Sequence, residues 1–239
     1  MFTQYTSTLT MNENILEDDE QDEETEDSTV AVFDTFINIS LKGVVCSQTI
    51  DPIVELIINV NLNDEFEKLE VINLFIDTDG GDLSCAFKLI DVIRMSEIPI
   101  RTIGLGKVAS AGLLIFMSGD ERVFSENASI LSHQATYNAS NYSIKVSDSS
   151  HQQEFKHIMS RILKTYVRYS GKDEKYIKKH LLKDNDVYLS AEEAITHGLA
   201  DSVLPDGMSW LKTFGEFELD FELEEPKVEK PIDNQSETV

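Results

Sequence analysis

A serine stands among small residues where a strand is expected to end and a helix to begin. Residues 106–112 read Gly-Lys-Val-Ala-Ser-Ala-Gly, which places Ser110 at that junction. A serine hydroxyl acts as a nucleophile only when a neighbouring base takes its proton and backbone amides bind the oxyanion that forms. The segment offers an exposed turn and free amides. Because such a sequence at a helix start is more often a plain cap, Ser110 needs partners elsewhere in the chain.

Three more positions could supply those partners, although each also has an ordinary structural interpretation. His133 directly follows a buried-looking strand, whereas the other four histidines fall in helical segments that look solvated. Asp186 lies four residues before Ser190, the expected cap of a short helix. The pair Gly80-Gly81 forms a second strand-to-helix turn, where glycine lets the backbone approach a ligand with its amide free. No single one of these residues decides the function.

The elements that would hold these residues alternate between strands and helices, which is the pattern of an α/β layer fold. Strands are expected at 36–41, 71–77, 100–105, 122–124, 130–132 and 202–204. Helices are expected from Asp51, with Pro52 at the first position, after Asp82, over 109–117, over 148–169 and from Ser190 to Gly198. The helix over 148–169 is the longest of them.

The net charge of -24 is concentrated at the two ends of the chain. Residues 1–41 carry eleven acids and no Lys or Arg, and residues 214–239 carry nine acids against two lysines. The remaining residues 42–213 therefore carry only -6. We expect an acidic, disordered leader at 1–29, a folded domain at 30–213 and an acidic tail at 214–239.

Composition argues against several classes of partner and cofactor. A chain this acidic is repelled by nucleic-acid phosphates and by anionic membrane surfaces. Its first residues lack the basic segment and the apolar stretch of a secretion signal. No run of about 18 uncharged apolar residues occurs either, and both observations favour a cytoplasmic protein. Cys46 and Cys85 are too few for a disulfide framework or a metal site, and we interpret both as small buried hydrophobic residues. No cofactor or metal is expected.

Taken in their order along the chain, these motifs resemble the proteolytic subunit of the Clp protease. The resemblance rests on Gly-x-x-Ala-Ser-x-Gly around Ser110, the upstream Asp-Gly-Gly turn, His133 before Gln134, and Asp186 ahead of a helix cap. It spans roughly residues 34–205. Each motif is moderately specific, and four in the right order make a chance match improbable.

The resemblance implies a serine endopeptidase that hydrolyses peptide bonds of protein substrates. Ser110 would attack the peptide carbonyl, His133 would take its proton, and Asp186 would orient the imidazole. The N–H groups of Gly81 and Ala111 would form the oxyanion hole.

The resemblance also implies a crotonase-like α/β fold of stacked ββα units, with a projecting handle at about residues 136–172. Family members form seven-membered rings, stacked in pairs around a chamber, and receive unfolded chains from a ring ATPase. The acidic leader before Val30 lacks the apolar loop expected to meet such an ATPase. One interpretation is a divergent, phage-encoded relative that acts in the host cytoplasm on a substrate of its own.

The glycine turn departs from the family, which usually has Ser-Pro before the two glycines. Here Thr78 and Asp79 precede Gly80, and Asp77 and Asp82 lie close by in the sequence. The three acids are therefore expected near the oxyanion hole, where negative charge would oppose an oxyanion.

Three alternatives stay open at this point. A non-catalytic or partner-activated ring subunit would keep the fold, and the acids around the glycine turn favour it. A crotonase-fold acyl-CoA enzyme would use the same paired turns but would not require Ser110, His133 and Asp186 together. A serine-lysine peptidase would need Lys107, three residues before Ser110, as its base.

Overall fold

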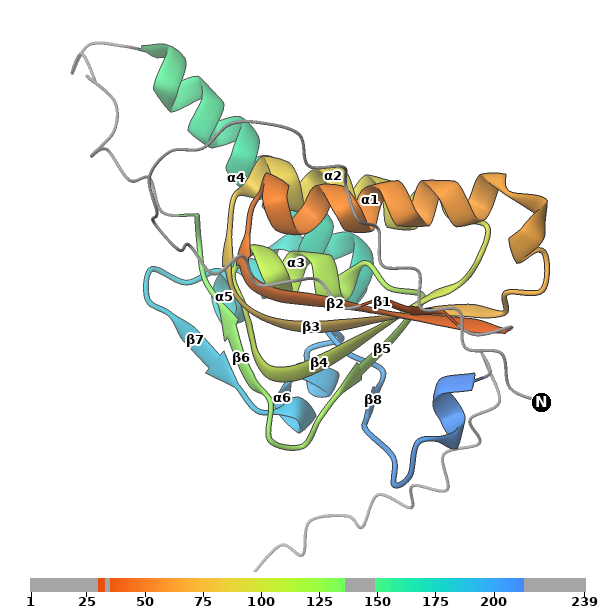
Figure 1. Cartoon of the computed structure of the whole chain (residues 1–239). Coiled ribbons are helices and arrows are strands. Elements are labelled where there is room, and N and C mark those ends of the chain that lie inside the picture. The colour runs from red at the N-terminus through yellow and green to blue at the C-terminus, as the bar shows by residue number, and fades with distance from the viewer. Residues whose placement is uncertain (1–29, 33–34, 136–148, 213–239) are drawn as a thin grey trace, which may run out of the picture.

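The computed structural model describes residues 30–32, 35–135 and 149–212, so the predicted leader and tail lie outside it. Within those residues, eight strands form one sheet in the order β1-β2-β3-β4-β5-β8, with β6 pairing to β4 and β7 (Figure 1). The pairs β1–β2 and β6–β7 are antiparallel and the others are parallel. The strands are β1 (Val30–Val32), β2 (Phe36–Val45), β3 (Val71–Gly81), β4 (Ile100–Ala109), β5 (Glu121–Phe124), β6 (Ser129–Ser132), β7 (Val187–Leu189) and β8 (Ser202–Val203).

Helices alternate with these strands, and the predicted α/β class is confirmed. The α-helices are α1 (Ser47–Leu62), α2 (Leu83–Met95), α3 (Ala111–Met117), α4 (Ser149–Ser170), α5 (Glu174–His180) and α6 (Ala191–Thr196). Two short 3-10 helices are η1 (Asp64–Phe66) and η3 (Ser209–Lys212). In Figure 1, α1, α2 and α3 cover one face of the sheet and α4 projects away from the body. None of the helices in the described segments combines the length and apolarity that a membrane crossing needs.

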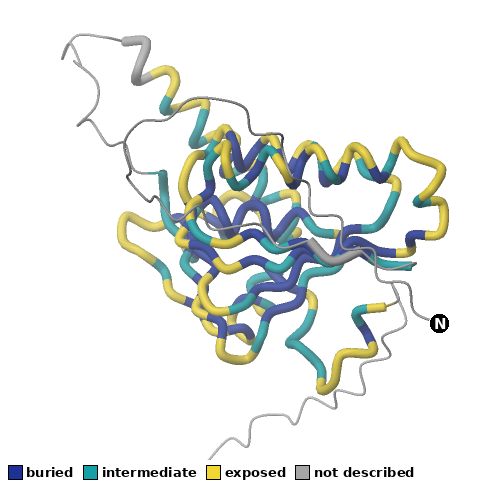
Figure 2. Tube along the Cα trace, in the orientation of Figure 1, coloured by how far each residue is buried: buried dark blue, intermediate teal, exposed yellow. Residues whose placement is uncertain are grey.

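The central strands are buried because helices and loops cover them. Ile37, Ile39 and Leu41 alternate along β2 and are fully buried. In β3 the run from Val71 to Leu74 is buried without alternation, as expected for a strand covered on both faces. Figure 2 shows this burial as dark blue along the strands and the inner sides of the helices.

The three strands that lead to the proposed site are longer than predicted. β2 continues to Val45 and β3 to Gly81, and these two residues are paired in the register. β4 continues to Ala109, and Thr78 pairs with Val108 after a register shift. Pairing with neighbouring strands therefore extends each strand past the point where its apolar run stops.

The first helix starts earlier than predicted. α1 begins at Ser47, so Pro52 lies inside the helix and the expected start at Asp51 is wrong. The cause is a capping box, in which Cys46 N–H donates to Thr49 Oγ1 at 3.1 Å. Cys46 is half-buried at this cap, contrary to expectation, while Cys85 is buried as predicted.

The long helix predicted over 148–169 is present as α4. Gly171 follows it with φ 67°, the left-handed conformation in which a glycine commonly ends a helix. The remainder of the predicted handle, residues 136–148, lies outside the described residues. α5 and β7 were not foreseen, because short elements in a charged segment give little periodic signal.

A buried arginine fastens the last described segment to the middle of the sheet. Arg101 is fully buried and pairs through Nε with Glu121 Oε2 at 2.6 Å. Its Nη1 donates to Asn73 Oδ1 at 3.1 Å and to Trp210 O at 3.0 Å. The guanidinium also lies 5.0 Å from the Trp210 ring centroid. Because every partner is in place, this charge can be buried beneath η3, on the sheet face opposite α1 (Figure 1).

We expect Trp210→Ala to lower the free energy of unfolding by about 3–5 kcal/mol, because a buried indole and its contact with Arg101 are lost. Urea unfolding followed by circular dichroism measures the change. Met208→Ala is the matched control, since Met208 lies in the same segment and is 78% exposed. Equal unfolding midpoints for the two variants would contradict this account of the segment.

Candidate active site

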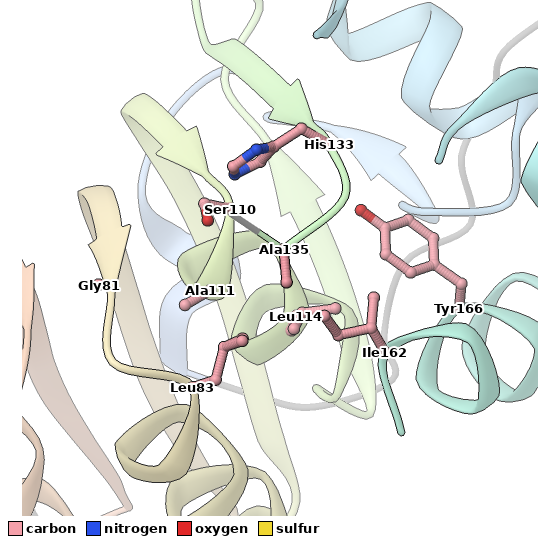
Figure 3. Close-up of a pocket in the computed structure, with 9 residues that line it drawn as sticks. All are labelled: Gly81, Leu83, Ser110, Ala111, Leu114, His133, Ala135, Ile162 and Tyr166. Carbon is pink, nitrogen blue, oxygen red and sulfur yellow. The ribbon is translucent and has the colours of Figure 1, made fainter. Parts of the chain in front are cut away.

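Ser110 lies between the end of β4 and the start of α3, with φ 55° and ψ -122°. Among the described residues it is the one non-glycine residue with a positive φ. Such a conformation costs about 1–3 kcal/mol and persists only where the surroundings impose it. Its amide donates to Leu131 O at 3.0 Å, and its carbonyl accepts from Leu113 N at 3.1 Å. The hydroxyl makes no helix-capping bond, and Ser110 lines a small cavity (Figure 3).

The glycine turn at the end of β3 presses against Ser110. A Cβ on Gly80 would lie 2.7 Å from Ser110 Cβ and 3.1 Å from Ala111 N, so only glycine fits. Gly80 and Gly81 both have positive φ, which glycine adopts without strain. Gly81 and Ala111, whose amides the family resemblance implied for an oxyanion hole, both line the cavity. The first amide of α3, that of Ala111, has no acceptor within its own helix.

Thr78 holds the glycine turn in place, and sequence reasoning missed it. Its side chain is buried, and its Oγ1 donates to Gly43 O and accepts from Gly80 N at 3.0 Å. The Gly80 amide is therefore committed to the turn. The available signal was a hydroxyl residue two positions before a glycine pair, a common turn device.

The pairing of β6 with β7 brings His133 and Asp186 together. Ser132 lies opposite Val187 in the antiparallel pair. His133 follows Ser132 and Asp186 precedes Val187, so both lie at the same end of the two strands. His133 Nδ1 is 3.9 Å from Asp186 Oδ1, too long for a hydrogen bond. Within the described residues, no hydrogen bond joins Ser110 Oγ to the His133 ring. Catalytic hydrogen bonds are often long before substrate binds, so this open arrangement is compatible with a triad.

Four of the five predicted site residues line one cavity of about 70 Å³ (Figure 3). They are Gly81, Ser110, Ala111 and His133. The fifth, Asp186, lies behind His133 and is 54% exposed. The remaining walls are apolar side chains from four parts of the chain: Leu83, Leu114, Ala135, Ile162 and Tyr166. Helical periodicity predicts that such residues are buried, but it does not show that they face a cavity.

The three acids around the glycine turn have partners of their own. Asp77 Oδ1 accepts from Lys107 N at 2.9 Å, and Asp79 forms an ion pair with Lys107 Nζ. Asp82 Oδ1 accepts from Cys85 N at 2.8 Å and caps α2. None of the three lines the described cavity. The expectation that their charge opposes an oxyanion is therefore weakened, because each carboxylate is engaged in holding the backbone or a lysine.

Lys107 is poorly suited to act as the base. Its hydrogen bond to Asp79 raises the pKa of the Lys107 ammonium, which keeps the side chain protonated near neutral pH. A general base must be unprotonated, so this contact disfavours the serine-lysine alternative.

No metal centre is evident in the part of the chain that the structure describes. Among these residues, no three His, Cys, Asp or Glu side chains gather as metal ligands would.

Comparison with known proteins decides the family. A family model described as Clp protease matches residues 20–207. The chain belongs to the Clp protease family. It is also 29% identical over 178 residues to the ATP-dependent Clp protease proteolytic subunit 2 of Treponema denticola, covering 72% of this chain and 86% of that protein.

Membership makes this chain a serine peptidase of the Clp type, and it confirms the resemblance inferred from the motifs. The mixed sheet, mostly parallel and covered by helices, agrees with the fold that the motifs implied for the Clp family. An identity of 29% also agrees with the expected divergence. The acyl-CoA alternative loses its support, because the family is one of peptide hydrolases.

We expect Gly80→Ala to lower peptidase activity by about 100-fold or more, because the new Cβ displaces Ser110 or Ala111 by a large fraction of an ångström. Gly171→Ala is the matched control. Gly171 also has positive φ, but a Cβ there meets nothing within 4 Å. The Gly171→Ala variant therefore measures the effect of backbone strain without a steric clash. Steady-state cleavage of a peptide, with circular dichroism to check folding, measures both. A folded Gly80→Ala variant with native activity would contradict the close approach.

Proposed function

We propose that this chain hydrolyses peptide bonds through a Ser110–His133–Asp186 triad. One observation carries the proposal: Ser110 is held at a strained positive φ in the same cavity as His133, Gly81 and Ala111. A turn that costs free energy and frees a hydroxyl beside an imidazole is typical of a nucleophile and is unnecessary for a plain helix cap.

Each group has a balanced part in the proposed reaction. Ser110 Oγ forms a bond to the peptide carbonyl carbon while its proton passes to His133 Nε2. The carbonyl oxygen becomes an oxyanion that accepts hydrogen bonds from the Gly81 and Ala111 amides. Collapse of the tetrahedral intermediate breaks the peptide C–N bond, and the His133 imidazolium donates its proton to the leaving amine. Water then attacks the acyl-enzyme and gives its proton to His133, the ester C–O bond breaks, and the proton returns to Ser110 Oγ. Asp186 faces the Nδ1 side of the ring.

The cavity walls favour an apolar side chain at the residue before the cleaved bond. Leu83, Leu114 and Ile162 line the space next to Ser110, and no Asp, Glu, Lys or Arg is among the lining residues. Desolvating a charged side chain there would be costly without a partner. A short apolar or aromatic-containing peptide is therefore the first substrate to use.

We expect a fluorophosphonate probe to label the native chain and to lose about 10⁴-fold in rate with Ser110→Ala or His133→Ala. The first variant lacks the nucleophile and the second lacks the base. Intact mass after labelling measures the modification. Lys107→Met is the control for the serine-lysine alternative, and its labelling rate should stay far above that of Ser110→Ala because Lys107, held protonated by Asp79, is not the base. Labelling that persists in Ser110→Ala would overturn the assignment.

We infer further that seven copies of the chain assemble into a closed ring, and that two such rings stack on each other. Support comes from family membership and from the name of the Treponema denticola relative, which describes a proteolytic subunit of an ATP-dependent protease. That name also supports a ring ATPase as a partner that delivers protein substrates. A small open cavity on a single chain needs such an enclosure to be selective for unfolded chains.

Mass photometry of the native protein tests the ring proposal. We expect particles of seven or fourteen copies of the 27.0 kDa chain. Ser110→Ala should give the same particles, since it changes the volume of one side chain very little. A monomer at micromolar concentration, with peptidase activity retained, would contradict the ring.

A further inference from the structure

A buried chain of hydrogen bonds lies next to the proposed catalytic histidine. Ser132 Oγ is 2.7 Å from the Tyr166 hydroxyl and 2.8 Å from Leu181 O. Ser132 is 0% exposed and Tyr166 is 2% exposed. A carbonyl can only accept and a serine has one hydroxyl proton, so Ser132 donates to Leu181 and Tyr166 donates to Ser132.

These bonds join three parts of the proposed site that are far apart in the sequence. Tyr166 lies on α4, Ser132 ends β6 directly before His133, and Leu181 follows α5 on the way to Asp186. Gln134, on the other side of the histidine, donates from Nε2 to Leu182 O at 3.0 Å. Both neighbours of His133 are thus tied to consecutive carbonyls at the end of α5.

We propose that Tyr166 and Ser132 form a positioning clamp that sets the His133 ring relative to Ser110 and Asp186. The Tyr166–Ser132 clamp rests on the proposed triad and adds two residues that act through His133 without touching the reacting atoms. Such a clamp is needed because Asp186 lies 3.9 Å from His133 Nδ1 and is too far to fix the ring by itself.

Tyr166 is suited to this role by its surroundings. Burial raises the pKa of the Tyr166 phenol, so the hydroxyl remains a donor throughout the working pH range. Its ring also lines the cavity, while in Figure 3 the hydroxyl points toward the chain around His133. Removing the hydroxyl alone therefore breaks the clamp and keeps the apolar wall.

The test is Tyr166→Phe, measured with an apolar peptide substrate. We expect kcat to fall about tenfold, because a small misplacement of a catalytic group is costly, and KM to stay unchanged because the wall is intact. Tyr169→Phe is the matched control on the same helix. The Tyr169 hydroxyl is buried without a hydrogen-bond partner among the described residues, so its loss should leave kcat unchanged.

A double-mutant cycle separates the clamp from simple loss of stability. Ser132→Ala should also lower kcat, and adding Tyr166→Phe to it should cost nothing further, because the two residues act as one unit. Melting temperatures of all variants are measured in parallel. A lower melting temperature with native kcat in Tyr166→Phe would overturn the clamp, as would fully additive losses in kcat.

A second measurement of the clamp does not depend on catalytic turnover. In ¹⁵N-histidine spectra of the neutral ring, Tyr166→Phe should reduce the His133 population that carries its proton on Nδ1, while Tyr169→Phe should not. If the native chain cleaves no peptide, the proposed triad fails and these spectra still decide the clamp. An unchanged His133 tautomer in Tyr166→Phe would then overturn it.

Discussion

The close approach of the Gly80 backbone to Ser110 is the contact on which the site depends. It requires β3 to continue in register with β2 through Val45 and Gly81, past the point where its apolar residues end. It also requires glycines in the turn at the end of β3. Thr78 holds this turn by accepting a hydrogen bond from Gly80 N. With those conditions met, Gly81 and Ala111 line one cavity with Ser110, which has a positive φ. The backbone strain at Ser110 is thus offset by the hydrogen bonds that pair the parallel strands.

The charge around the turn is compensated locally rather than removed. Asp79 pairs with Lys107, Asp77 accepts from the backbone of β4, and Asp82 caps α2. The contacts of Asp77 and Asp79 with Lys107 also join the end of β3 to β4. An acidic turn is therefore compatible with an oxyanion site, because the carboxylates have hydrogen-bond donors that do not belong to the cavity. The same ion pair raises the pKa of the Lys107 ammonium and disfavours Lys107 as a base.

The two halves of the proposed triad are held by different means. On the serine side, backbone hydrogen bonds and a close glycine contact leave little freedom, as the bond from Ser110 N to Leu131 O illustrates. On the histidine side, His133 follows a four-residue strand, and its acid is half-exposed at 3.9 Å. Side-chain bonds from Ser132 and Gln134 to the end of α5 supply the missing rigidity. The Tyr166–Ser132 hydrogen bond also links α4 to the end of β6, directly before His133.

The sequence by itself determined the α/β class, the long helix α4 and the set of residues around Ser110, because periodicity and short motifs act over neighbouring positions. Ser110, His133 and Asp186 were singled out because their motifs, in order along the chain, resemble those of the Clp family. Their proximity, the partners of the acids and the Tyr166–Ser132 hydrogen bond were decided only by the tertiary structure. Strand register sets these contacts, and it depends on pairing between segments tens of residues apart, which no local pattern encodes. For the same reason the sequence showed Thr78 only as a departure from the family's glycine turn, and not as the residue whose side chain holds that turn.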